Sequence, residues 1–232
     1  MLISDNKIFF SLLSILPISI VAGPTVSLIN MLLIVFLYLF IFFKDKHYKF
    51  LFKNNIIRLL FVLYIYLIFN SFISIDFESG LMRNAGFIRL IFLFLAINYF
   101  FHISQKNLNV FNIWSIFLLI FLSDVYFEKF TGANIFGWGG NYGPRIVGFF
   151  KDEPIAGAYI NGFNLLICGY LLLIFKNNQK LYFPLILLFL YFLFSIIITG
   201  ERSNTFKALF SITLFLSCLD FIKLRSKVLI FL

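Results

Sequence analysis

Long apolar runs, separated by short polar stretches, fill most of this chain. The run from Leu181 to Ile198 contains no charged residue. Runs of about 15–20 continuous apolar residues have the length of helices that cross the hydrocarbon core of a bilayer. A membrane β-barrel would instead show alternating segments of about ten residues. The pattern therefore predicts an all-α protein, a polytopic bundle of transmembrane helices.

Turn-forming and polar residues set the limits of the runs. Residues 8–43 are almost uninterrupted apolar sequence, far longer than one span needs, so Gly23-Pro24 is expected to divide them into a hairpin. The glycine-rich polar segment 128–154 is expected to form an outer loop. We expect eight spans, at approximately 8–22, 25–43, 56–73, 84–101, 110–127, 155–175, 181–198 and 205–219.

The chain ends in a short apolar stretch, Val228 to Leu232, after the basic segment 220–227. This stretch has the character of the start of a ninth span. We therefore expect residues 1–232 to form a single transmembrane domain that is truncated at its C-terminus.

Composition and charge narrow the choice of environment and partner. The chain is 62% hydrophobic and only 12% charged, which leaves too little polar surface to cover a soluble domain, so the expected partner is the lipid bilayer. The net charge of +9 is spread over short loops, and nucleic acid is therefore not expected. The sequence has no metal-binding spacing and no glycine-rich loop before a Lys-Ser or Lys-Thr pair, so we expect no metal and no cofactor.

The distribution of basic residues orients the predicted helices. With the N-terminus in the cytoplasm, the inner segments hold 12 basic and 3 acidic residues and the outer segments hold 7 of each, which together account for the 19 and 10 of the chain. Cytoplasmic loops of membrane proteins carry the excess of Lys and Arg. The N-terminus is therefore expected to be cytoplasmic, and the loop 128–154 lies on the outer face.

Several charged residues gather on that outer face. Arginine stays charged and binds phosphate through two parallel hydrogen bonds, and an arginine inside a span is a functional candidate by default. A carboxylate beside such a site can act as a general base. The candidates for binding a pyrophosphate or glycan are Arg145, Arg202, Arg89 and Arg83. The catalytic candidates are Glu153, Asp152 and Glu201.

Each candidate also has an ordinary structural explanation. Arg89 can extend along its helix to the membrane surface. Glu201-Arg202 can be a local ion pair, and Lys151-Asp152-Glu153 a solvated loop. Asp124, near the end of the fifth run, can cap its helix or reach water. The functional hypothesis depends on the joint placement of these residues on one face.

Two of these charged stretches resemble a known family. The stretch from Arg145 to Tyr159 and the stretch from Thr199 to Ser203, supported by the hairpin at Leu16 to Pro24 and by Phe130 to Gly137, resemble the O-antigen ligase and polymerase family of bacterial membrane proteins. The resemblance implies a multi-pass protein of the bacterial inner membrane that works in lipopolysaccharide biosynthesis. Its members join undecaprenyl-pyrophosphate-linked oligosaccharides at the periplasmic face, without a metal or nucleotide.

The resemblance leaves three functions to consider. A polymerase-type glycosyltransferase is the first hypothesis, and other polysaccharide-assembly proteins would then be partners. A ligase that transfers the glycan to lipid A-core is the second, and a transporter or flippase of lipid-linked glycan is the third. Family members usually have more spans and a large later loop with an important histidine, which this chain lacks. This departure leaves open whether the chain acts as an enzyme on its own.

Overall fold

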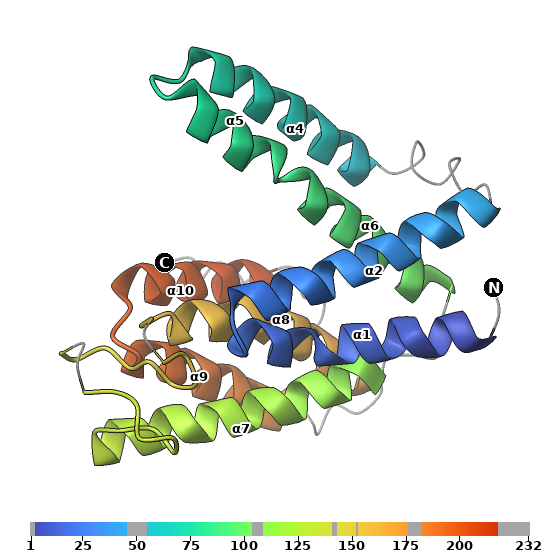
Figure 1. Cartoon of the computed structure of the whole chain (residues 1–232). Helices are drawn as coiled ribbons and strands as arrows, with labels where there is room; N and C mark the ends of the chain where they lie inside the picture. Colours follow the sequence, from blue (N-terminus) through green and yellow to red (C-terminus); the bar gives the residue numbers. More distant parts are fainter. Residues whose placement is uncertain are drawn as a thin grey trace. The chain divides into compact units, whose positions relative to one another are not determined.

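The regular secondary structure in the part of the chain that the structure describes is all helical. A computed structural model describes residues 3–45, 55–103, 109–140, 143–151, 153–175 and 182–217 (Figure 1). The helices are α1 (Ile3–Val21), α2 (Pro24–Asp45), α4 (Asn55–Ile73), α5 (Phe77–Ala85), α6 (Ile88–Ile103), α7 (Asn109–Thr131), α8 (Ala156–Phe175), α9 (Tyr182–Ile198) and α10 (Arg202–Ser217). The all-α prediction is confirmed.

Several of these helices are suited to a membrane. Within the described ranges, five stretches are long and apolar enough to cross one: Pro24–Phe43, Asn55–Ile73, Phe77–Phe101, Asn109–Thr131 and Ala156–Ile174. Shorter apolar stretches lie at Lys7–Val21 and Ile186–Ile198. The chain therefore has the helices of a membrane protein, but the expected count of eight spans is not confirmed. The expected start of a ninth span lies outside the described residues.

Two boundaries differ from the predicted ones. The fourth span was placed at 84–101, whereas the chain turns between the end of α5 at Ala85 and the start of α6 at Ile88. The outer loop was placed from residue 128, whereas α7 continues to Thr131. Glu128 is thus part of the helix. Its carboxylate can be buried there because it accepts hydrogen bonds from the backbone of the segment after α7.

The chain forms two compact units, Met1–Val110 and Phe111–Leu232. In the first unit, the predicted break at Gly23-Pro24 is confirmed. Gly23 has a φ of 126°, in the region that glycine adopts without strain, and Pro24 is the first residue of α2. The Asn30 amide then joins the two helices, donating to the Leu12 carbonyl and the Ser19 hydroxyl at 3.2 Å each.

A second polar contact joins α4 to α5 within the same unit. The Asn84 amide donates to the Leu67 carbonyl at 2.9 Å and to the Ser71 hydroxyl at 2.8 Å. Asp76 caps α5 by accepting from the Ser79 N–H at 3.2 Å, and hydrogen bonds from Ser79 lower the pKa of this exposed carboxyl. Hydrogen bonds such as those of the Asn84 amide stabilise the association of helices in membrane proteins.

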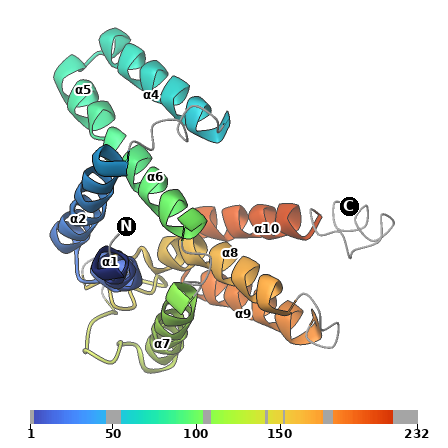
Figure 2. The same ribbon diagram turned by 90° about the vertical axis from the view of Figure 1, so that its right-hand side faces the viewer.

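The second unit is a bundle of α7 to α10 (Figure 2). Helix α8 packs against both α9 and α10. Aromatic side chains join α7 to its neighbours: Trp114 lies 5.4 Å from Phe163 of α8, and Tyr126 stacks on Tyr191 of α9 at 5.4 Å between ring centroids. At one end of this bundle, the segment 132–155 connects α7 to α8.

We predict that Asn84→Ala destabilises the first unit by about 0.5–2 kcal/mol, because it removes both amide hydrogen bonds between α4 and α5. The measurement is unfolding of the protein in mixed micelles with increasing SDS, followed by helical circular dichroism. Asn70→Ala is the matched control, since Asn70 is an exposed asparagine of α4. Equal midpoints for the two variants would contradict the assigned role.

Candidate functional site

A buried glutamate of α7 holds the segment 132–155 against the bundle. Both oxygens of the Glu128 carboxylate accept backbone hydrogen bonds, from Val147 N–H at 3.0 Å and from Gly148 N–H at 2.7 Å. The side chain is only 4% exposed. A Cβ at Gly139 would lie 2.7 Å from a Glu128 carboxylate oxygen. The segment can therefore approach Glu128 so closely only because residue 139 is glycine.

Two more polar side chains fix the first part of the segment. The Asp124 carboxylate accepts from Ile135 N–H at 2.9 Å. The Asn134 side-chain oxygen accepts from Phe136 N–H at 3.0 Å and from Trp138 N–H at 2.8 Å, while its amide donates to the Gly148 carbonyl. Residue 134, near the start of the segment, is thus bonded to residue 148, and both parts are also bonded to α7.

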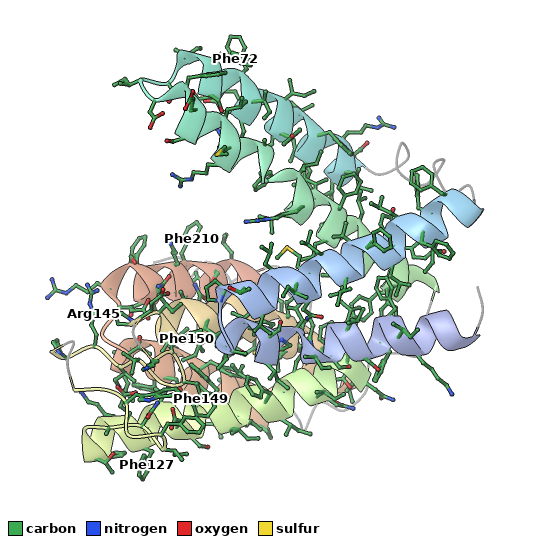
Figure 3. All side chains as sticks on the ribbon, in the orientation of Figure 1. Phe72, Phe127, Arg145, Phe149, Phe150 and Phe210 are labelled. Atoms are coloured by element: carbon green, nitrogen blue, oxygen red, sulfur yellow. The ribbon has the colours of Figure 1, made fainter. Side chains whose placement is uncertain are left out.

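Aromatic rings fill the space beneath these polar contacts (Figure 3). Phe149 lies 5.4 Å from Phe121 of α7 and 5.5 Å from Phe136, measured between ring centroids. Phe150 lies 5.5 Å from Tyr159 of α8. The segment is therefore a packed part of the unit rather than the flexible loop that its glycines alone would predict.

Glu201 makes a similar connection between α8 and α10. One carboxylate oxygen accepts from Gly157 N–H at 2.6 Å, in the first turn of α8, and the other accepts from the Asn204 amide. A Cβ at Gly157 would lie 2.6 Å from the Thr199 hydroxyl oxygen and 3.0 Å from Glu201. Because both oxygens are engaged and the side chain is only 9% exposed, the geometry favours a positioning role for Glu201.

The turn before α10 brings the two charged stretches together. Ile146 N–H donates to the Thr199 carbonyl at 3.2 Å. Gly200 has a φ of 75°, and a Cβ there would lie 3.0 Å from the Pro144 carbonyl oxygen. Arg145 and Arg202 are the neighbours in sequence of Ile146 and Gly200–Glu201, so these backbone contacts bring both arginines to one pocket.

A pocket of about 1020 Å³ opens at this place. Arg145 and Arg202 are both exposed, and neither makes a hydrogen bond or an ion pair with another described residue. Arg202 is also the first residue of α10, where the N–H groups of the first turn favour an anion. The pocket is lined by Pro144, Arg145, Pro154, Ile197, Gly200, Glu201, Arg202, Ser203, Thr205, Phe206 and Leu209. Its charge suits a negatively charged ligand.

The structure brings together only some of the residues proposed from the sequence. Arg145, Glu201 and Arg202 line the same pocket. Glu153 is exposed in the same segment but does not line the pocket, and Asp152 lies outside the described residues. Arg83 and Arg89 are exposed residues of the other unit. Within the described ranges, no group of three or more His, Cys, Asp or Glu side chains could hold a metal ion.

The roles of Glu128 and Asp124 in holding the segment are not predicted from the sequence. Glu128 was counted among the charges of the outer loop, whereas it is buried and holds the backbone next to Arg145. The available signal was the spacing: two acids four residues apart lie on one face of a helix. They come at the end of an apolar run and just before a glycine-rich segment, where backbone N–H groups need acceptors.

Comparisons of the chain with known proteins find no matching family model, no similar curated protein and no similar solved structure.

We predict that Gly157→Ala lowers the free energy of unfolding by about 1–3 kcal/mol, because the new methyl group overlaps the Thr199 hydroxyl. The control is Gly162→Ala in the same helix, where a Cβ has no neighbour within 4 Å and alanine stabilises a helix by up to about 1 kcal/mol. SDS unfolding of both variants checks this. A Gly157→Ala variant as stable as Gly162→Ala would contradict the contact.

We predict that Glu128→Ala exposes the segment around Arg145. The Val147 and Gly148 N–H groups lose their acceptor, so their hydrogen exchange should be about tenfold to a hundredfold faster. Hydrogen–deuterium exchange of peptides that cover residues 146–151 measures this. Glu153→Ala, which removes an exposed acid of the same segment, should leave exchange unchanged, and equal protection in both variants would refute the role of Glu128.

Proposed function

We propose that the pocket between Arg145 and Arg202 binds the pyrophosphate of a lipid-linked glycan, and that the chain is a polymerase-type glycosyltransferase. The observation that carries this proposal is a pair of arginines on one pocket at the end of an apolar helical bundle, neither of which pairs with another residue that the structure describes. The same proposal places the pocket at the periplasmic face of a bacterial inner membrane, with the N-terminus in the cytoplasm. The distribution of basic residues supports this orientation.

The chemistry of glycosyl transfer fits two arginines at this place. The acceptor hydroxyl attacks the anomeric carbon of the donor, the bond from that carbon to the pyrophosphate oxygen breaks, and the hydroxyl proton passes to a base. Negative charge increases on the departing pyrophosphate, and fixed guanidinium groups stabilise it. The arginines thus act on the leaving group, where binding lowers the barrier.

The acids have different parts in this proposal. Glu201 positions α10, and with it Arg202, because both of its oxygens accept hydrogen bonds. Glu153 is an exposed acid whose carboxylate has no partner in the described part of the chain. Glu153 does not line the pocket, so it can act as the general base only if the acceptor sugar extends from the pocket to it, and the same holds for its sequence neighbour Asp152. A base of this kind needs to be free to accept the acceptor's proton.

Transport of a lipid-linked glycan is the second candidate, and one observation favours it. Arg89 lies inside the candidate span Phe77–Phe101, close to the turn between α5 and α6. Interrupted helices with charged groups near the middle of the membrane are typical of transporter binding sites. A transporter would move glycan units without changing their length, whereas a polymerase sets the length of the polysaccharide.

We predict that Arg202→Ala shortens the polysaccharide at the cell surface, because removing one charged donor at a developing anion costs roughly a hundredfold in rate. The variant is tested in the strain that encodes the protein, by gel analysis of polysaccharide length. Arg202→Lys should restore it only partly, since lysine lacks the bidentate geometry. Lys207→Ala, an exposed charge of the same helix away from the pocket, should have no effect.

Unchanged chain length in Arg202→Ala, with normal protein levels, would overturn the proposed role of Arg202. Loss of surface polysaccharide in Arg89→Ala, with polymer length unchanged in Arg202→Ala, would favour transport.

A further inference from the structure

A stripe of exposed apolar side chains follows one face of α7. Ile116, Leu119 and Ile120 are 60%, 46% and 51% exposed, and Phe127 and Phe130 near the end of the helix are 46% and 84% exposed. Their spacing of three, four and seven residues puts them on the same face. Because α7 is one of the helices apolar enough to cross the membrane, this exposed apolar face is the one that we expect to contact lipid.

Apolar exposure continues past the end of the helix. Ile135 and Phe136, in the segment after α7, are 62% and 60% exposed. Ile135 N–H is bonded to Asp124 of α7 at 2.9 Å, so this part of the segment is held against the helix. We call the side chains of Phe127, Phe130, Ile135 and Phe136 the aromatic patch. In Figure 3, Phe127 points away from the packed rings of Phe149 and Phe150.

The backbone N–H groups next to the patch are hydrogen-bonded within the protein, as a lipid environment requires. Residues 130–140 include no charged side chain. The N–H groups of four consecutive residues, 135–138, all have acceptors inside the protein. The Phe136 and Trp138 N–H groups donate to the Asn134 side chain. The Gly137 N–H donates to the Asn134 carbonyl at 2.9 Å, and the Ile135 N–H donates to Asp124. Irregular backbone is tolerated near lipid only when its polar groups are satisfied in this way.

We infer that the aromatic patch sits in the interfacial layer of the bilayer, so that the first half of the segment after α7 lies in lipid rather than in water. The occupant of this surface is lipid because α7 carries exposed apolar side chains along its length and the uncharged, apolar-exposed residues 130–136 follow directly at its end. Trp138 supports the assignment: its ring lies 5.1 Å from that of Phe136, and tryptophan is enriched at membrane interfaces.

The second half of the segment has the opposite character. Arg145, Lys151 and Glu153 are exposed there, and all three are charged. The segment is therefore divided into a lipid-contacting half and a half that faces water and headgroups. One consequence rests on the proposed function: the patch would hold the pocket of Arg145 and Arg202, in the same unit, near the depth of lipid phosphates.

Depth-dependent quenching of tryptophan fluorescence tests the inference without any substrate. The full chain with Trp114→Phe and Trp138→Phe receives a single new tryptophan, as Phe130→Trp or Phe136→Trp, and is reconstituted in phosphatidylcholine vesicles. Lipids brominated on their acyl chains quench tryptophan in the bilayer, and iodide quenches tryptophan in water. Leu119→Trp on the stripe is the control for lipid contact, and Lys151→Trp is the control for water contact.

We predict that tryptophan at positions 130 and 136 behaves like that at 119, with strong quenching by brominated lipid and an iodide quenching constant several-fold lower than at 151. Iodide quenching equal to that of position 151 would overturn the inference. Protection from both quenchers at 130 and 136 would also overturn it, because a protein surface such as a second copy would then cover the patch. Phe130→Trp and Phe136→Trp each replace one aromatic ring with another, so neither substitution should disturb the fold. The two positions therefore test the inference independently.

Discussion

The placement of Arg145 depends on one interaction, the pair of hydrogen bonds from the Val147 and Gly148 N–H groups to the carboxylate of Glu128. A carboxylate buried to this extent is costly unless hydrogen bonds satisfy it. The backbone of a loop has the converse need, because its buried N–H groups require acceptors. A single side chain in the last turns of α7 meets both needs and fixes the conformation of the residues beside Arg145.

Glycines let the other contacts form around this interaction. Gly139 admits the Glu128 carboxylate, Gly157 admits Thr199 and Glu201, and Gly200 lets the turn before α10 approach Pro144. The acids at 128 and 201 accept hydrogen bonds from backbone and amide groups, and neither forms an ion pair with the arginines in the described part of the chain. In the described part of the chain, Arg145 and Arg202 have no partner, and under the proposed function a pocket built this way would need little reorganisation to bind an anion.

The sequence allowed the helices to be predicted but not the arrangement of the loop. Long apolar runs and the Gly23-Pro24 break are local signals, and the structure confirms the all-α fold and the break between α1 and α2 that they predict. The joint placement of Arg145 and Arg202 was inferred from charge distribution, and the pocket brings the pair together. The role of Glu128 depends on contacts with residues about twenty positions away, which no local pattern contains. The turn between α5 and α6 was not predicted because it lies just inside the start of the apolar run 84–101, which reads as one continuous helix.

The central claim is that the folded segment makes Arg145 and Arg202 parts of one anion site. The most direct measurement is the affinity of the purified full chain for a short, water-soluble prenyl diphosphate, in a double-mutant cycle of Arg145→Ala and Arg202→Ala. Each single variant should lose about tenfold to a hundredfold in affinity, and the two losses should be non-additive by roughly 0.5–3 kcal/mol, as for residues that share one ligand. An Arg145→Ala variant that binds the diphosphate as tightly as the unmodified chain would contradict the claim.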